Sequence, residues 1–176
     1  MIKINAEFKK NGFNGEWEPE FTREMSSAME QSLALLEREV RRNEPNDRGT
    51  LRTGTRGILI SPLRGIVGVI GPAERYAEVM EKGRRPNKRR PPIDVIMGWL
   101  KRTDKGKAFV RSIKEKYKIK KKTTALKSAA FLKARAIGKK GIRGKFMFKN
   151  AEIELKPKVN EVFSKAINAL EQRFRG

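Results

Sequence analysis

Residues 76–102 read YAEVMEKGRRPNKRRPPIDVIMGWLKR and place a run of cations between two apolar helical patterns. In the first pattern, Tyr76, Val79 and Met80 fall on one side of a short helix, and Gly83 is typical of the residue that follows a last helical turn. Pro86 prevents any simple continuation of this helix. The stretch therefore predicts a helix, a loop and a second helix, with the cations in the loop. These cations are Arg84, Arg85, Lys88, Arg89 and Arg90.

The second helical pattern of the stretch begins after Pro91 and Pro92. Pro92 suits the first helical position, because the N–H that it lacks would have no helical partner there. Asp94 falls in the first turn, where the helix dipole favours negative charge. The apolar residues of this helix recur on one face, and they are Ile93, Ile96, Trp99 and Leu100.

The net charge of +22 is concentrated in the middle of the chain. Residues 1–83 carry 13 Lys and Arg against 13 Asp and Glu, residues 84–149 carry 24 against 3, and residues 150–176 carry 5 against 4. Clustered cations displace counterions from phosphate whatever the base sequence, and they also suit an acidic protein surface. No helix-turn-helix, zinc or RNA-recognition signature accompanies them, so nothing predicts base-specific readout.

A second cationic run, Lys120, Lys121 and Lys122, follows a helical pattern that passes through Phe109 and Ile113. Two interpretations of this run stay open: a flexible solvated loop, and contact with DNA or with an acidic protein. Another helical pattern comes next and lasts until GKKGIRGK interrupts it. Its members are Leu126, Ala129, Ala130, Lys133 and Ile137.

The chain contains neither Cys nor His. Disulfides, thiolate metal sites and Cys nucleophiles are therefore excluded, and the commonest general base and metal ligand is missing. The cluster GKKGIRGKF is no phosphate loop, because Phe146 stands where a Walker motif needs Ser or Thr. We expect a protein that is not an enzyme and that holds no cofactor and no metal.

One pattern suggests an enzyme instead. It is formed by Glu152, Glu154 and Lys156, an arrangement that a Mg²⁺-dependent nuclease could use. The spacing is weakly specific, and no partner Asp on a strand accompanies it. A solvated face before the last helix is the favoured interpretation.

The flanks predict the fold. A stripe from Phe21 to Val40, with spacings of three and four residues, predicts a long N-terminal helix, and a second stripe predicts a C-terminal helix that begins at Pro157. Two short β-branched runs, GILIS and RGIVGVIG, predict a hairpin, with a bulge or a close backbone approach at Gly68. Ile2 to Phe8 add a possible strand.

The predicted fold class is α+β: a small antiparallel β-sheet, with the hairpin at its centre, packed by the long N-terminal helix and the C-terminal helix. We expect a single domain over residues 1–176, with a basic loop and helical insert at 84–123. No apolar run has the length of a signal peptide or a membrane span, so we expect a soluble protein made in the cytoplasm, without membrane contact.

The order of these parts resembles a known family, the minor tail component or neck (head-tail joining) proteins of lambdoid HK-type long-tailed phages. The resemblance covers about residues 20–175. Its matching residues are RGTLRTG at 48–54, then Tyr76, Ala77, Glu81 and Gly83, then Pro91, Pro92 and Trp99, and finally Gly141, Ile142, Gly144, Phe146 and Ala151.

The resemblance implies a structural subunit that assembles as a homo-oligomeric ring, a hexamer or a dodecamer, around the axis through which DNA passes. Its implied partners are the phage connector or stopper and the tail terminator or tail tube proteins. The implied location is the neck or tail of the virion, after assembly in the host bacterial cytoplasm. No catalytic residue is implied.

Within such a ring, we expect Arg84, Arg85, Lys88, Arg89, Arg90 and Lys120, Lys121, Lys122 to contact an acidic neighbour or the DNA in the channel without reading its sequence. The alternative from another class is a basic DNA-binding accessory protein that acts alone.

Overall fold

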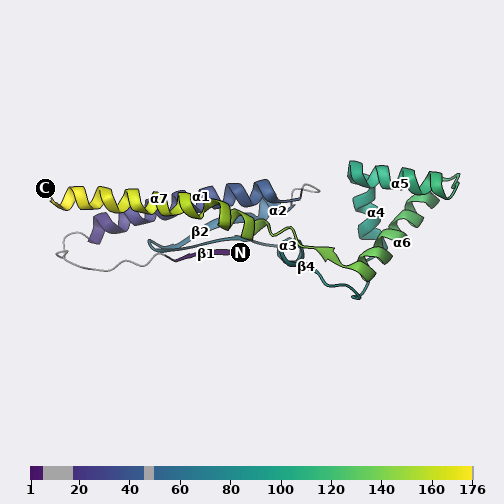
Figure 1. Cartoon of the computed structure of the whole chain (residues 1–176), viewed down its shortest axis with the longest axis horizontal. Helices are drawn as coiled ribbons and strands as arrows, with labels where there is room; N and C mark the ends of the chain where they lie inside the picture. Colours follow the sequence, from purple (N-terminus) through teal and green to yellow (C-terminus); the bar gives the residue numbers. More distant parts are fainter. Residues whose placement is uncertain (6–17, 46–49, 176) are drawn as a thin grey trace. The chain divides into compact units, whose positions relative to one another are not determined.

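The structure is a computed structural model that describes residues 1–5, 18–45 and 50–175. Contacts divide the described residues into two compact units (Figure 1). The α/β unit comprises residues 1–45, 50–81 and 145–176, and the helical unit comprises residues 82–144. The single domain over residues 1–176, with a basic loop and helical insert at 84–123, stays a prediction.

The described chain contains both helices and strands. In order they are β1 (Ile2–Asn5), α1 (Glu18–Asn43), α2 (Thr50–Gly54), β2 (Thr55–Ser61), β3 (Arg64–Val69), α3 (Glu74–Lys82), β4 (Gly83–Arg84), α4 (Ile93–Arg102), α5 (Asp104–Lys116), α6 (Lys122–Lys140), β5 (Ile142–Arg143) and α7 (Met147–Arg175). Part of the predicted first strand, at 6–8, and the first two residues of RGTLRTG lie outside the described residues.

The sheet of the α/β unit is antiparallel, with the order β1-β3-β2, and β2 and β3 form the predicted hairpin. Val67 on the central strand lies opposite both Ile2 and Gly57. The predicted irregularity at Gly68 is wrong. Gly68 pairs in register with Arg56, and a Cβ added to it would meet only Met1, at 3.8 Å. The register shifts beside the turn instead, between Leu59 and Ser61.

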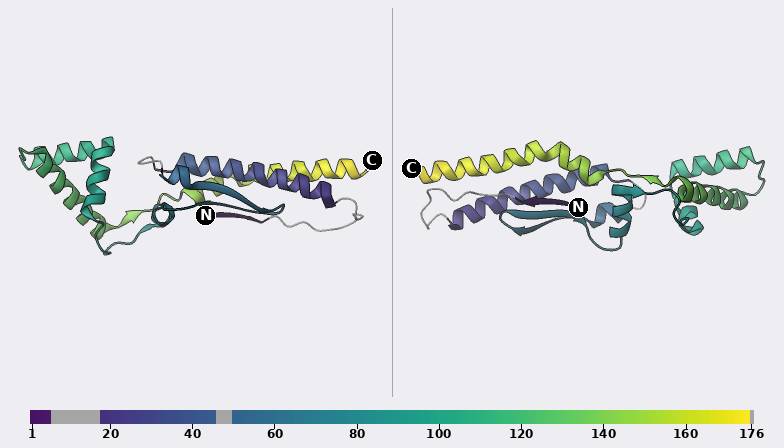
Figure 2. Two further views of the ribbon diagram at one scale, coloured as in Figure 1. Left: turned by 180° about the vertical axis from the view of Figure 1, so that it is seen from behind. Right: turned by 60° about the horizontal axis from the view of Figure 1, so that its bottom comes forward.

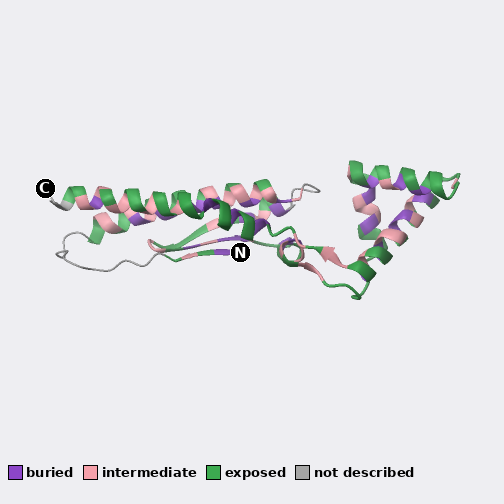
Figure 3. Cartoon of the chain, in the orientation of Figure 1, coloured by how far each residue is buried: buried purple, intermediate pink, exposed green. Residues whose placement is uncertain are grey.

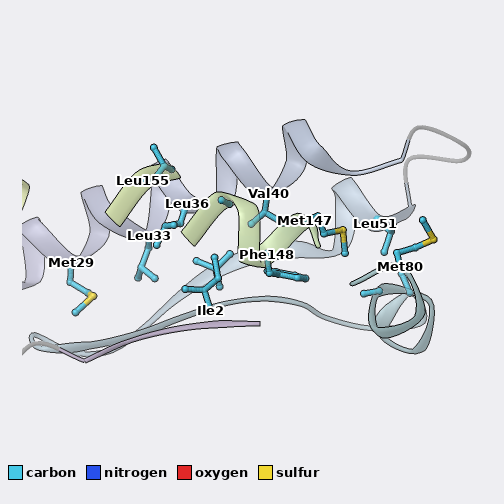
Figure 4. Close-up of a cluster of buried hydrophobic side chains, with 14 residues drawn as sticks. Ile2, Met29, Leu33, Leu36, Val40, Leu51, Met80, Met147, Phe148 and Leu155 are labelled. Carbon is cyan, nitrogen blue, oxygen red and sulfur yellow. The ribbon is translucent and has the colours of Figure 1, made fainter. Parts of the chain in front are cut away.

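Helices α1 and α7 lie side by side, and α1 packs on the hairpin strands (Figures 1 and 2). The predicted stripe of α1 is confirmed from Met25 onward, where every member is at most 4% exposed, whereas Phe21 is half-buried. Figure 4 shows Met29 and Leu33 reaching from α1 toward the sheet that carries Ile2. Full burial of one such side chain contributes about 1.5–3 kcal/mol, so this interface stabilises the unit.

Helix α7 begins at Met147, ten residues before the predicted start at Pro157. Proline removes a backbone donor from the helix and leaves the carbonyl four residues earlier without a partner. That carbonyl belongs to Ile153, and both residues are exposed, so water can satisfy it. A proline on a solvated face therefore sits inside this helix instead of starting it.

The helical unit contains α4, α5 and α6 around a second apolar cluster. All three helices were anticipated by the sequence patterns. Helix α6 faces this cluster with small residues, and its buried positions are Ala125, Ala129, Ala130, Ala134 and Gly138. Small side chains let neighbouring backbones approach closely, and larger residues such as Ile96, Leu100 and Ile113 complete the cluster. Exposed residues occur on all three helices (Figure 3).

The α+β fold class is confirmed: α1 and α7 pack with a three-stranded antiparallel sheet that contains the β2-β3 hairpin, and the middle of the chain is helical. Among the described residues, no helix combines the length and the apolar character that crossing a bilayer requires.

Candidate cationic interface and the motif residues

Glu81, one of the motif residues, caps the N-terminus of α7 from the end of α3. Its carboxylate accepts hydrogen bonds from the backbone N–H groups of Phe148, at 2.9 Å, and Lys149, at 3.1 Å. Its backbone carbonyl accepts a third, from the N–H of Phe146 at 3.2 Å. The first N–H groups of a helix lack helical partners, and a carboxylate there also complements the helix dipole. Glu81 therefore fixes where α7 begins.

Gly83 and Gly141 stand where two backbone segments of the helical unit cross closely. Both have positive φ, at 79° and 73°, a region that side chains with a Cβ rarely adopt. A Cβ on Gly83 would overlap the carbonyl oxygen of Ile142, and a Cβ on Gly141 would overlap that of Arg84. Between them, β4 pairs with β5 through Arg84 and Ile142. Only glycine fits these two crossing points.

The remaining motif residues also build local structure. Ala77 is buried in the core of the α/β unit, whereas Tyr76 is 43% exposed. Pro92 lies just before α4, at the cap position and not at the predicted first helical position. Phe146, with a φ of 53°, makes the turn into α7. Ala77, Pro92 and Phe146 therefore have local structural roles.

Trp99 and Phe109 form a cation–π arrangement with Lys133, which the sequence pattern could not reveal. The ammonium group of Lys133 lies 5.8 Å from the centre of the Trp99 ring and 5.7 Å from that of Phe109. The helical pattern had placed Lys133 on the apolar face of α6, and the two aromatic rings explain how a cation is accommodated there.

The cations between α3 and α4 are mostly solvated. Arg85, Lys88, Arg89 and Arg90 are exposed, whereas Arg84 is half-buried and donates through Nη2 to the carbonyl oxygen of Arg89. The guanidinium of Arg90 lies 5.8 Å from the centre of the Phe131 ring. Arg84 and Arg90 therefore contact other groups of the helical unit, whereas Arg85, Lys88 and Arg89 are exposed to solvent.

The second cationic run is exposed throughout and leads directly into a helix. Lys120 and Lys121 precede α6, and Lys122 is its first residue. No acidic residue occupies the first turn of α6. Positive charge at a helix N-terminus opposes the helix dipole and costs about 0.3–1 kcal/mol for each charge. Local stability therefore does not explain this run.

The helical unit as a whole is strongly cationic. Residues 82–144 carry 23 Lys and Arg against 3 Asp and Glu, so this unit holds a net charge of +20 out of the total of +22. Three carboxylates cannot pair with 23 cations. The cations of the predicted insert at 84–123 all lie within this unit.

The structure does not bring together a Mg²⁺ site from Glu152, Glu154 and Lys156. Glu152 and Glu154 are exposed on α7, and residues two apart on a helix do not face each other. Within the described residues, no three His, Cys, Asp or Glu side chains gather closely enough to hold a metal ion. The arrangement gives paired-carboxylate chemistry no geometric basis.

A surface of the α/β unit that the sequence analysis missed is its outer sheet face. Ile58, Ile60 and Ile70 are 45%, 51% and 53% exposed. The hairpin runs were apolar on both faces, so their pattern did not reveal which face would stay uncovered. No protein-family model, curated protein or solved structure was found to match the chain.

Proposed function

We propose that the protein is a structural virion protein of a tailed phage or prophage, a neck or tail-completion subunit that assembles as a ring at the head-tail joint. The observation that supports ring assembly is the set of exposed apolar side chains on the outer face of the sheet. Together with the order of motifs in the sequence, it favours a subunit that completes its burial on neighbours. Hexamer or dodecamer rings, contacts with connector or stopper and tail terminator or tail tube proteins, and a place in the virion neck or tail follow from that resemblance.

The outer sheet face is defined by strand geometry. Side chains alternate between the faces of a strand, and Gly57 packs toward α1, where a Cβ would lie 3.0 Å from Cβ of Leu33. Ile58 therefore points away from α1, as does Ile66 directly opposite it on β3. Ile60, at the register shift beside the turn, and Ile70, which follows β3, are exposed as well. Large exposed apolar side chains that gather on one face mark surfaces that a partner covers.

The face is a better contact than the edge of the sheet. On β2, the backbone N–H of Gly57 donates to a carboxylate oxygen of Glu37 at 2.6 Å, and Nη2 of Arg41 donates to the carbonyl oxygen of Thr55 at 2.9 Å. These side chains occupy edge groups that an added strand would need. A neighbouring subunit is therefore expected to cover the isoleucine face instead of extending the sheet at β2.

The test compares matched charge insertions by size-exclusion chromatography with light scattering. We expect the wild-type protein to form oligomers, and Ile58→Asp with Ile60→Asp to stay monomeric while keeping its circular dichroism spectrum. Ile153→Asp is the control, because Ile153 is 65% exposed but lies on α7. A wild-type protein that stays monomeric at every concentration would remove the proposal.

A second candidate function is a basic DNA-binding accessory protein that acts alone. The observation that favours it is the net charge of +20 on the helical unit. Because phosphate contacts release counterions, binding to a short duplex would then weaken steeply with salt and show no sequence preference. A monomer that binds duplex DNA in this salt-dependent way favours the second candidate. An oligomer that does not bind duplex DNA excludes it.

A further inference from the structure

A shallow apolar groove crosses the surface of the helical unit between α4, α6 and the segment that joins α5 to α6. Its volume is about 800 Å³. Three of its lining residues are large and substantially exposed: Ile93 at 42%, Tyr117 at 54% and Phe131 at 44%. Met97 and Leu132, both half-buried, continue the apolar lining.

The exposed members of this lining, Ile93, Tyr117 and Phe131, do not belong to the core of the helical unit. Met97, Ile119 and Leu132, by contrast, pack against that core from the floor of the groove. On α4, the buried members are Ile96 and Leu100, while Ile93 was predicted on the same face and stays exposed. A unit with a net charge of +20 has ample polar surface, so a cluster of exposed apolar side chains is not forced by composition. The groove is thus a second apolar surface without a covering element among residues 82–144.

Cations border the groove and lean over its aromatic rings. Arg90 lies over Phe131 at 5.8 Å, and Lys116 lies over Tyr117 at 5.6 Å from the ring centre. Lys127 is part of the lining, and Asp94 is its one acidic residue. An occupant must therefore offer apolar side chains to the floor and negative charge to the border.

We propose that this groove binds an acidic polypeptide segment that carries large apolar side chains. The apolar anchors would enter between Ile93 and Phe131, and carboxylates would meet Arg90 and Lys127. Charge complementarity selects an acidic occupant, because a basic or neutral segment would face a border of cations without compensation. The proposal is independent of ring assembly, because it uses only the helical unit.

A single nucleic acid strand fits the groove less well. Bases stack on free aromatic faces, while the backbone follows a line of cations. Here a cation already lies over each exposed ring, and aliphatic side chains of Ile93, Met97 and Leu132 make up much of the floor. Asp94 would also repel a phosphate. These features favour amino-acid side chains over nucleotides.

The experiment uses the full-length protein and three fluorescent probes of matched length and charge. The first is a synthetic peptide of about four helical turns, rich in Glu, with Leu and Phe at positions i, i+3, i+4 and i+7. The second replaces those Leu and Phe residues by Ala, and the third is a strand of oligothymidine. Fluorescence anisotropy at physiological salt measures the dissociation constant of each probe.

We expect the first peptide to bind about tenfold or more tightly than the Ala peptide, because apolar anchors in a pocket dominate such interfaces. Ile93→Ser with Phe131→Ser should remove that preference, with the circular dichroism spectrum unchanged. Lys139→Ala with Lys140→Ala is the control, because these exposed cations do not line the groove. It should weaken both peptides equally and leave the preference intact.

Two outcomes would overturn the proposal. Equal affinity for the two peptides would mean that charge alone drives binding and that the groove is not used. Oligothymidine that binds tightest, and loses its affinity in the Ile93 and Phe131 double variant, would assign the groove to nucleic acid instead.

Discussion

The α/β unit and the helical unit use charge in opposite ways. The helical unit has 23 Lys and Arg against 3 Asp and Glu, whereas the rest of the chain has 19 against 17. In the α/β unit, carboxylates hold backbone groups: Glu37 binds the N–H of Gly57, and Glu81 binds two N–H groups of α7. The comparison shows that charge in the α/β unit holds backbone groups, whereas most cations of the helical unit have no carboxylate of that unit to pair with.

The largest expected effect comes from a substitution of Gly141. It tests whether close backbone packing, instead of charge, holds the helical unit together. Gly141→Ala places a Cβ against the carbonyl oxygen of Arg84 at a φ of 73°, so both overlap and backbone strain oppose it. We expect a loss of about 3 kcal/mol in the free energy of unfolding, measured by urea titration with circular dichroism.

Gly71→Ala separates the two causes of that loss. Gly71 has a φ of 89°, but nothing lies within 4 Å of the added Cβ. This control should lose only the backbone part, about 1–2 kcal/mol. Equal losses for the two variants would show that the crossing of β4 and β5 tolerates a side chain.

The second test asks whether carboxylates of the two units differ in structural importance. Glu81→Ala leaves the N–H groups of Phe148 and Lys149 without their acceptor, so we expect a loss of about 2 kcal/mol in urea titration. Glu115→Ala is the counterpart in the helical unit, where Glu115 is exposed on α5. Its loss should stay within about 0.5 kcal/mol, and comparable losses would break the comparison.

The third test uses the pH dependence of stability in the α/β unit. Burial raises the pKa of Glu44 above 4.5, and the hydrogen bond from Thr55 and the charges of Arg52 and Arg41 oppose this only in part. The folded state therefore binds the proton more tightly than the unfolded state. The stabilising contribution is complete below pH 4.5 and is lost as the pH rises through the raised pKa of Glu44.

Glu44→Gln removes the buried charge and keeps an oxygen that can accept from Thr55. We expect the melting temperature of this variant to exceed that of the wild type at neutral pH, with a difference that shrinks as the pH falls toward 4.5. Glu152→Gln, at an exposed site on α7, should show no such trend. A difference for Glu44→Gln that grows in acid would reverse the assigned sign.

Local patterns predicted most of the elements, because the spacing of apolar residues in α1 and in the hairpin strands can be read within each segment alone. The start of α7 could not be predicted in this way. Its cap, Glu81, lies 67 residues before Phe148, so no local signal marks Met147 as a beginning while Pro157 offers a misleading one. Tertiary capping outweighed the proline signal.

The candidate surfaces were predicted only in part. The cations were visible in the sequence because charge counts need no geometry. The apolar groove and the isoleucine face were not visible, because periodicity identifies an apolar face but not whether another element covers it. Ile93 shows the limit: its spacing matches that of Ile96 and Leu100, yet those two are at most 8% exposed and Ile93 is 42% exposed.

The smallest expected effect separates stability from binding at the second cationic run. Lys122→Glu replaces a charge that opposes the dipole of α6 by one that complements it, so we expect a gain of about 0.5 kcal/mol in urea titration. Lys140→Glu makes the same change of net charge in the last turn, where the dipole favours the lysine, and should lose a similar amount. If the charge of the helical unit serves binding, both variants should bind a short duplex or an acidic peptide more weakly than the wild type, despite opposite effects on stability. Binding that follows stability instead would mean that these lysines act through the fold, and the contrast between the two units would then not extend to function.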